Sequence, residues 1–341
     1  MKLNLIKKFT SLALISVMLL TGCAQGTAKT TEPEKQADEQ VAVEVKDSFT
    51  IGISQLVEHP ALDASKQGFI DEMANQGIDV KFLDQVAQGD IANAQMIAEK
   101  FVKDDVDLIF TIATLSAQAA KQSIEGTDIP MVFTAVTDPV FSQLVTDLNV
   151  TDKNITGVVD AAPIKENLEM FKELKEDIKS IGIIYNIGES NSEVQVEQTK
   201  EIAATLGLQI ETVGITSVND IPQAVDTISK KVEGLYIITD NMVASAMSLV
   251  AKLAGENGLL TVSADGSHVA EGILVSKGIS YYEIGKQSAM IAKEILVDNK
   301  DVAEISVQAS ENLEKMVNVK TMEALGLTKD HKAFQGAEFL D

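Results

Sequence analysis

The sequence predicts an α/β protein with two doubly wound, parallel-sheet lobes and a ligand cleft between them. From residue 49 onward, short β-rich runs alternate with helical stretches of about 10 to 15 residues, which is typical of βαβ units. The β-rich runs are almost continuously Ile, Val and Leu, as expected for strands covered on both faces of a sheet. The series occurs twice, which favours two lobes of one plan joined near Thr156 to Pro163.

The first series begins with Phe49 to Ile53, a short β-rich run, and its first helix starts at His59-Pro60. A second helix is expected over 90–102, because Ile91, Ala94, Ile97, Ala98 and Phe101 fall on one face at helical spacing. Further strands are expected at 78–83, 107–112 and 130–135, and a helix at 116–124.

The second series begins at Ser180 and repeats the same alternation. Strands are expected at 180–185, 208–213, 234–238, 259–263 and 273–276. Helices are expected at 193–206, 220–228, 243–254 and 282–296, with a short one from Ser267.

Hydroxyl, amide and acidic side chains follow the predicted strands in both series. In open parallel sheets, ligands bind beyond the carboxyl ends of the strands, and two facing lobes would enclose such a ligand between them. The candidate ligand-binding residues are therefore Ser54, Gln55, Glu58, Thr114, Ser116, Thr137, Asp138, Tyr185, Asn191, Ser192, Asp240, Asn241, Asp265 and Tyr281.

Residues 1–22 have the layout of a secretory signal peptide. A basic start with Lys2, Lys7 and Lys8 precedes an apolar run to Leu20. A permanent transmembrane helix is the alternative, but the run of about 12 residues is short of the roughly 20 that span a bilayer.

Leu20-Thr21-Gly22-Cys23 resembles the bacterial lipobox, in which the cysteine receives a diacylglyceryl group. Cys23 is the only cysteine of the chain, so lipidation or a disulfide-linked dimer would account for it, and no intrachain disulfide is possible. Residues 23–48 are rich in Gln, Thr, Lys and Glu with few large apolar side chains, which indicates a flexible tether.

The composition is strongly acidic and contains neither Trp nor Arg. The net charge of −23 becomes about −26 once the three signal-peptide lysines are removed, which argues against nucleic acid as a partner. Without a guanidinium fork, an anionic ligand group must be held by hydroxyls, backbone N–H groups, helix N-termini or a lysine.

Five segments resemble the ABC-transporter substrate-binding lipoproteins of the tryptophan/tyrosine-type group. These are residues 51–64, 135–140, 183–192, 239–241 and 281–287. The resemblance spans about 49 to 327 and implies the type I periplasmic-binding-protein fold with three crossovers. One lobe would comprise 49–157 plus 281–307, and the other 158–280 plus 308–341.

The resemblance also implies an aromatic amino acid as the favoured ligand, captured by hinge closure. This chain departs from the family near the expected cleft. Ser280 replaces an acid, Leu115 replaces a proline, and Ala162 replaces a serine before Pro163. These departures bear on the ligand more than on the fold.

For a free amino acid, the carboxylate could be held by the Thr114 and Ser116 hydroxyls at a helix start, or by Thr137 and Asp138. Each pair could instead only cap a helix or form a turn.

The ammonium needs an acid, with Asp240 first, then Asp265, then Glu58. A helix cap is the alternative for Asp240, and an exposed turn charge is the alternative for Glu58. Tyr185 and Tyr281 could pack an apolar ligand group.

The remaining polar side chains near the expected cleft are candidates for contacts with the ligand or for local structural roles. Ser54 and Gln55 could hydrogen-bond the ligand, Asn191 and Ser192 either cap or contact it, and His59 is as readily a turn residue as a ligand contact.

An enzymatic function is not expected. The three histidines have no metal-helix spacing, and no nucleophile elbow, Walker loop or dinucleotide fingerprint is present. We expect no cofactor or metal. The expected partners are a small solute, an ABC permease, and the membrane through the lipid on Cys23.

We expect a monomer on the extracytoplasmic face of a Gram-positive cell membrane. A ligand-sensing or adhesion lipoprotein that presents its bound form to a signalling partner is the alternative.

Overall fold

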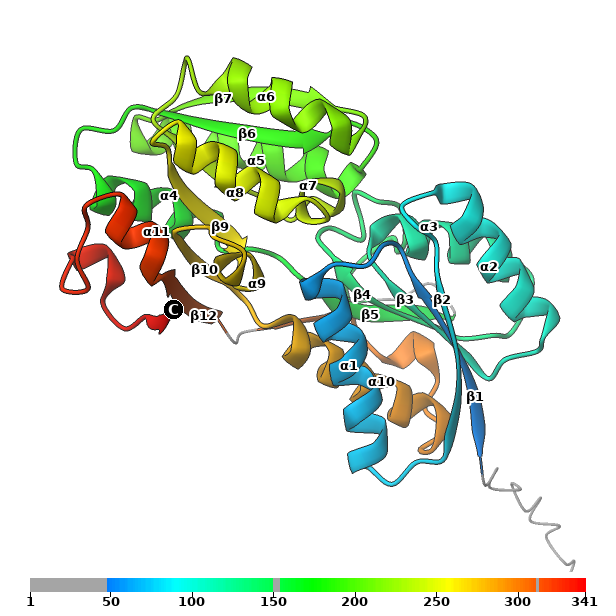
Figure 1. Ribbon diagram of the computed structural model, residues 1–341. Helices are drawn as coiled ribbons and strands as arrows, with labels where there is room; N and C mark the ends of the chain where they lie inside the picture. The colour runs from blue at the N-terminus through cyan, green and yellow to red at the C-terminus, as the bar shows by residue number, and fades with distance from the viewer. Residues whose placement is uncertain (1–47, 150–153, 311–312) are drawn as a thin grey trace, which may run out of the picture. The chain divides into compact units, whose positions relative to one another are not determined.

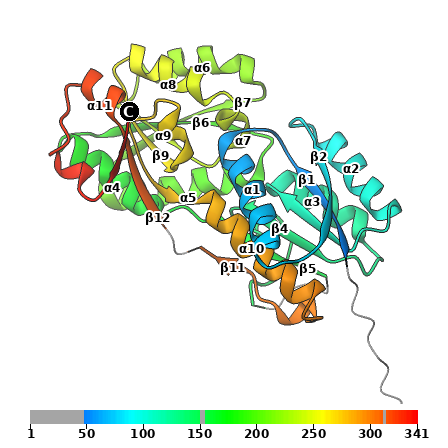
Figure 2. The same ribbon diagram turned by 60° about the horizontal axis from the view of Figure 1, so that its bottom comes forward.

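The computed structural model describes residues 48–149, 154–310 and 313–341. The expected signal peptide and nearly all of the expected tether, including Cys23, lie outside the described residues. The described chain forms two sheets with helices on both faces of each, as Figures 1 and 2 show.

The first sheet has six strands in the order β11-β5-β4-β3-β1-β2, all parallel. Its strands are β1 Phe49–Gln55, β2 Val80–Val86, β3 Leu108–Ile112, β4 Met131–Val136, β5 Ile155–Val159 and β11 Gln308–Ala309. Its helices are α1 Pro60–Asn75, α2 Ile91–Lys103, α3 Thr114–Ile124 and α10 Tyr281–Leu296.

Alternate side chains of these strands belong to two hydrophobic clusters on opposite faces of the first sheet. Phe110 and Val132 pack with α1 and α10, whereas Ile109 and Phe133 pack with α2 and α3. This is the doubly wound arrangement expected from the continuously apolar strands.

The second sheet has seven strands in the order β13-β12-β10-β9-β8-β6-β7. Its strands are β6 Ser180–Asn186, β7 Gln209–Ile215, β8 Gly234–Ile237, β9 Leu260–Asp265, β10 Val275–Ile279, β12 Leu313–Asn318 and β13 Glu338–Leu340. Its helices are α4 Ile164–Leu174, α5 Ser190–Leu206, α6 Ile221–Ile228, α7 Asn241–Ala244, α8 Met247–Glu256, α9 Ser267–Ala270 and α11 Val319–Ala324. Short 3₁₀ helices lie at Val218–Asp220, Val302–Glu304 and Lys332–Phe334.

The chain passes between the sheets three times, after β5, after β10 and after β11. Strand β5 continues to Val159, and β11 to Ala309, so the first sheet extends two residues beyond the expected lobe limits at 157 and 307. Residues 156–159, expected in a connection, belong to a strand instead.

The parallel sheets expected from the sequence are confirmed, with one antiparallel pair, β10 with β12, near the edge of the second sheet. One other expectation needs correction. The single helix expected over 243–254 is two helices, because Asp240 caps α7 and Ala246 leaves helical geometry before α8 begins.

Helices α1 and α10 approach closely enough that their contact requires glycine. A Cβ on Gly285 would lie 2.0 Å from the carbonyl oxygen of Ser65, and one on Gly68 would lie 2.1 Å from that of Tyr282. Both views show the two helices side by side (Figures 1 and 2). This contact fixes His59, at the start of α1, relative to Tyr281, at the start of α10.

None of the helices in the described ranges is long and apolar enough to cross a membrane.

Candidate functional site

A small cavity lies where strand ends of the first sheet meet strand ends of the second. Its walls come from the ends of β4 and β9, from the residues that follow β4, β5 and β8, and from the helices α1, α5, α7, α9 and α10. It is lined by His59, Leu62, Ala135, Thr137, Asp160, Asn191, Thr239, Asp240, Asn241, Ala244, Asp265, His268 and Tyr281. The space open to the centre of a water-sized sphere is about 10 Å³, close to the least that holds one water.

Hydrogen bonds cross directly from one lobe to the other around this cavity. His59 Nε2 lies 3.3 Å from Asn241 Oδ1, and the Thr137 and Thr239 hydroxyl oxygens are 3.2 Å apart. Outside the cavity lining, the Ser190 hydroxyl donates to the Ser142 hydroxyl at 3.5 Å. The two lobes are therefore closed on each other.

Hydrogen bonding assigns the tautomer of His59. Asn241 Nδ2 donates to Glu189 Oε2 at 2.5 Å, so Asn241 Oδ1 is the atom that accepts from His59. Nε2 of His59 therefore carries the proton, and Nδ1 is a buried acceptor with no hydrogen-bond partner in the described part of the chain. Burial and nearby His268 lower the pKa of His59, while Asp265 and the bond to Asn241 oppose the shift.

Asp240 is held by its own lobe. Its Oδ1 accepts from the Val243 backbone N–H at 2.9 Å, which caps α7. Its Oδ2 accepts from the Asn186 N–H at 2.6 Å and from the Ser192 hydroxyl at 2.7 Å. Burial, followed by the charge of Glu189, raises the pKa of Asp240 to about 7.

Glu189 is a buried carboxylate that the sequence analysis missed. It accepts hydrogen bonds from the Asn186, Asn191 and Asn241 side chains. It also accepts from the backbone N–H groups of Asn241 and Met242. Glu189 thus joins the turn after β6 to the start of α7 and orients both asparagines that line the cavity.

Asp265 is also satisfied locally, through Ser267. The Ser267 backbone N–H donates to Oδ1 at 2.8 Å and its hydroxyl to Oδ2 at 2.9 Å. His268 Nε2 lies 3.4 Å from Oδ2, but burial lowers the pKa of His268 to about 4, so this imidazole is neutral near pH 7. Burial raises the pKa of Asp265.

Asp160 follows β5 and was not among the predicted residues. The Tyr281 hydroxyl donates to its Oδ2 at 2.7 Å, and both side chains are buried. Burial raises the pKa of Asp160, and the hydrogen bond from Tyr281, then the Thr137 side chain and the Asp160 backbone N–H, oppose this shift. The pKa of Tyr281 is also raised, by burial and then by the Asp160 charge.

The start of α3 carries two buried hydroxyls. Thr114 Oγ1 and Ser116 Oγ are inaccessible to solvent and have no hydrogen-bond partner within the described ranges. The residue before them, Ala113, has φ 83° and ψ 155°, a region that glycine favours, which indicates local backbone strain. The helix N-terminus therefore presents hydroxyls and backbone N–H groups together, although neither hydroxyl lines the cavity.

Of the predicted residues, those that line the cavity are Thr137, Asn191, Asp240, Asn241, Asp265 and Tyr281. Those that do not are Ser54, Gln55, Glu58, Thr114, Ser116, Asp138, Tyr185 and Ser192.

The residues outside the cavity wall have varied surroundings. Glu58 is exposed, and Asp138 accepts from the N–H groups that follow it in a turn. Tyr185 packs against the core of the second lobe. Gln55 Nε2 donates to Val57 O and Asp63 Oδ1, and the neighbouring Ser54 hydroxyl is buried.

Cavity residues that the sequence analysis did not select include Asp160, His268 and Thr239. Asp160 obeys the same rule as the predicted residues, a polar side chain directly after a strand. It was missed because β5 was not recognised as a strand.

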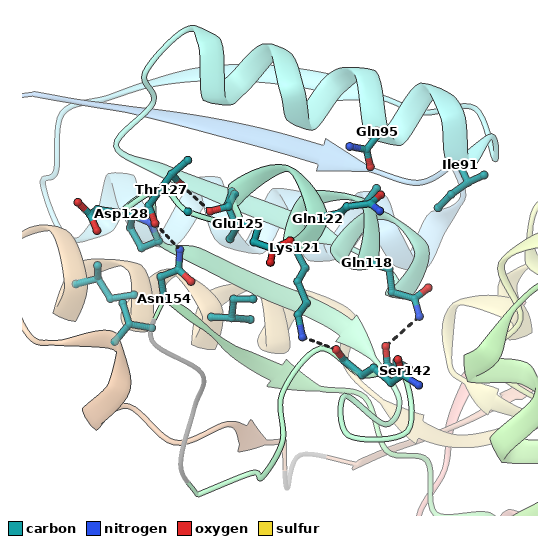
Figure 3. Close-up of a pocket in the computed structure, with 18 of the residues that line it drawn as sticks. Ile91, Gln95, Gln118, Lys121, Gln122, Glu125, Thr127, Asp128, Ser142 and Asn154 are labelled. Carbon is teal, nitrogen blue, oxygen red and sulfur yellow. Dashed lines mark hydrogen bonds between the residues drawn. The ribbon is translucent and has the colours of Figure 1, made fainter. Parts of the chain in front are cut away.

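A larger, open groove of about 1390 Å³ runs along α3 on the first lobe (Figure 3). Gln118 donates to the Ser142 carbonyl and Lys121 to the Gln143 carbonyl at one side of it. None of the predicted site residues lines this groove. Across residues 48–149, 154–310 and 313–341, no group of three or more His, Cys, Asp or Glu side chains is placed to hold a metal ion.

The family described as "ABC transporter substrate binding protein" matches residues 50–338. The chain belongs to this family. Its members bind solutes outside the cytoplasm and are not classed as enzymes. The fold expected from the sequence resemblance, two α/β lobes of the periplasmic-binding-protein type, is confirmed.

Among its relatives, this substrate-binding protein is 37% identical to a "Tyrosine-binding protein" of Clostridioides difficile, over 95% of this chain and 93% of that one. A Streptococcus pneumoniae structure in complex with L-Trp is 29% identical, with a TM-score of 0.80, and covers 85% of this chain and 100% of that chain.

A ligand-free, open structure of a Clostridium difficile substrate-binding protein with adhesive properties is 38% identical. It covers 86% of this chain and 99% of that chain, yet its TM-score is only 0.66. The less similar sequence, solved with L-Trp, thus superposes better than the more similar sequence solved open. The better superposition on the L-Trp complex agrees with the direct hydrogen bonds between the lobes, which are contacts of a closed conformation.

Proposed function

We propose that this protein is the solute receptor of an ABC importer and that it captures an aromatic amino acid by closure of its two lobes. The observation that carries the proposal is the interlobe cavity, which combines buried carboxylates and hydroxyls with the Tyr281 ring. The relatives named for tyrosine and solved with L-Trp support this ligand class.

The cavity must enlarge to admit such a ligand. In the closed arrangement it has room for about one water, whereas an aromatic amino acid is many times larger. We propose that the lobes separate at the three crossovers, admit the ligand and close on it as a hinge.

The ligand carboxylate is then expected at the start of α3. Thr114 and Ser116 supply hydroxyls that have no partner elsewhere in the described chain, and the helix N-terminus supplies N–H groups. The chain has no arginine to compete for this role.

Binding to the purified protein tests the proposal directly. A chain without residues 1–23 is screened by thermal unfolding against all common amino acids, with several sugars as a comparison panel. A ligand at about 100 times its Kd should add about 2.7 kcal/mol to the free energy of unfolding and raise Tm by several degrees. If the aromatic amino acids leave Tm unchanged while another solute raises it, the ligand class is wrong.

We further propose that Cys23 carries a lipid that anchors the protein to the outer face of a Gram-positive cell membrane. Its acidic body is repelled by anionic lipid, so the lipid has to supply the localisation. Cys23→Ala should therefore release the protein into the medium, measured by immunoblot of cell and medium fractions. Thr27→Ala, in the expected tether, should leave it with the cells. Retention of the Cys23→Ala protein would instead indicate an uncleaved leader.

A sensing or adhesive role is the second candidate, favoured by the adhesive properties ascribed to one structural relative. We propose a permease as the partner and a monomeric receptor as the form it meets. Deletion of the gene should abolish uptake of the labelled amino acid if transport is the function. Unchanged uptake together with reduced adhesion would favour the second candidate.

A further inference from the structure

Three buried carboxylates line the cavity, and they accept different numbers of hydrogen bonds from the protein. Asp240 accepts three hydrogen bonds from its own lobe, and Asp265 accepts two from Ser267. Asp160 accepts one at Oδ2, from the Tyr281 hydroxyl, and the nearby Thr137 side chain also lowers the pKa of Asp160. Its Oδ1 is buried and has no hydrogen-bond partner among the residues that the structure describes.

The cavity wall supplies no cation for Asp160. No lysine is among the lining residues, and the two lining imidazoles, His59 and His268, have pKa values lowered by burial. A carboxylate that is 2% exposed, without a paired cation, is unfavourable in its charged form. Asp160 therefore has no paired cation, and its Oδ1 has no hydrogen-bond donor among the residues that the structure describes. The residue itself belongs to the cavity lining.

Asp160 also lies at the hinge. It directly follows β5 at the first crossover, and Tyr281 opens α10 directly after the second crossover. The 2.7 Å hydrogen bond between them joins two of the three connections between the lobes. A cationic ligand group that binds Asp160 would therefore contact the connections about which the lobes rotate.

We propose that Asp160 is the counter-ion for the ligand's ammonium group and that closure therefore selects ligands with a cationic nitrogen. This inference rests on the proposed function and narrows it to ligands that carry a primary amine. It assigns the ammonium to Asp160 rather than to Asp240 or Asp265, whose carboxylate oxygens already accept hydrogen bonds from the protein.

The test compares an amino acid with its desamino analogue on three proteins, the wild type and two variants. The natural pair is L-tyrosine and 3-(4-hydroxyphenyl)propanoate, which differ only in the amine; L-tryptophan and indole-3-propanoate serve if tryptophan binds more tightly. Calorimetry on the chain without residues 1–23 gives six values of Kd, two for each protein. For the wild-type protein, we expect the amino acid to bind at least about 100-fold more tightly than the analogue.

Asp160→Asn should remove most of this preference. The amino acid should lose about 100-fold in affinity, whereas the analogue should change by less than about threefold, because it never made the charge pair. Asp265→Asn is the matched control, since it neutralises another buried carboxylate of the same cavity. It should shift both ligands alike and keep their ratio.

Other outcomes separate the two proposals. A preference for the amine that persists in Asp160→Asn, or that disappears only in Asp265→Asn, overturns the assignment while leaving the proposed function intact. If the wild-type protein binds the desamino analogue as tightly as the amino acid, this result alone overturns the assignment of the ammonium to Asp160. If no aromatic amino acid binds, the proposed function fails and this inference fails with it. Should Asp160→Asn not fold, as judged by its thermal unfolding, Asp160→Ser makes the same comparison.

Discussion

His59 precedes α1 with its imidazole buried between the lobes, where Nε2 donates to Asn241 of the second lobe. When the lobes separate, the ring returns to water and its pKa returns to about 6.5. Closure lowers that pKa, chiefly by burial, so the open form binds more protons at this ring than the closed form. The contribution of His59 to the stability of the closed form is therefore fully present above its ordinary pKa. This contribution is progressively lost as the pH falls below that pKa.

Ligand affinity should accordingly weaken on acidification. Between about pH 7.5 and about pH 5.5 we expect Kd to rise by up to about tenfold from this one group. His59→Gln keeps an N–H donor for Asn241 Oδ1 but cannot titrate, so its Kd should change less over the same range. Calorimetry of both proteins across the range checks this. The carboxylates Asp160, Asp240 and Asp265 are common to both, so only the difference between the profiles counts. Coincident profiles would contradict the prediction.

The sequence could predict which positions face the cleft, but not which polar atoms the protein leaves available there. The sequence predicts Asp240 first for a ligand ammonium, because it follows a buried strand, and Asp265 second. In the structure, backbone N–H and serine hydroxyl groups already donate to both carboxylates. That distinction depends on the turn conformations after the strands, which one sequence does not encode in a readable pattern.

At the level of elements, the position of the site depends on how α1 and α10 meet. Ser65 and Tyr282 present carbonyl oxygens where Gly285 and Gly68 have no side chain. The two glycines let the helix backbones approach closely, and the starts of both helices lie at the cavity. A displacement here would separate His59 from Tyr281 and change the cavity wall.

Gly285→Ala should therefore destabilise the protein, although alanine is a better helix former than glycine. Its methyl group would lie 2.0 Å from the Ser65 carbonyl oxygen, so one helix must shift, at a cost of about 1 to 3 kcal/mol. Gly255→Ala in α8 is the matched control. A methyl group there would meet no neighbouring atom within 4 Å, and helix propensity alone should stabilise this variant by about 0.5 to 1 kcal/mol. Urea unfolding measures both, and equal effects of the two substitutions would contradict the packing argument.

Periodicity predicted most of the elements, and the errors have identifiable causes. The helix expected over 243–254 is interrupted because Asp240 and Asn241 start a separate short helix, α7, whose apolar residues continue the period of α8. Strand β5 was overlooked because its residues fall where the chain was expected to cross between lobes. The antiparallel β12 lies after the last crossover, beyond the repeated pattern.

At the scale of the whole molecule, the sequence predicted two lobes but could not predict their closed arrangement. That arrangement depends on a few contacts between residues far apart in the chain, such as Thr137 with Thr239 and Ser142 with Ser190. These contacts are weak hydrogen bonds at 3.2 and 3.5 Å, so closure is expected to be reversible and to be driven by the ligand.

The Ser142 and Ser190 pair offers a way to observe closure, because it joins the two lobes and neither residue lines the cavity. With residues 1–23 removed, the chain has no cysteine, so Ser142→Cys with Ser190→Cys introduces a single possible intrachain disulfide. Mild oxidation should form it much faster with a bound amino acid than without, because the ligand shifts the population toward the closed form. The oxidised protein should then retain the ligand through dialysis and release it on reduction, as mass spectrometry would show. Each single-cysteine variant is the control and should release its ligand under both conditions. A cross-linking rate that does not respond to the ligand would mean that the lobes close without it, and hinge closure could not then be the step that captures the solute.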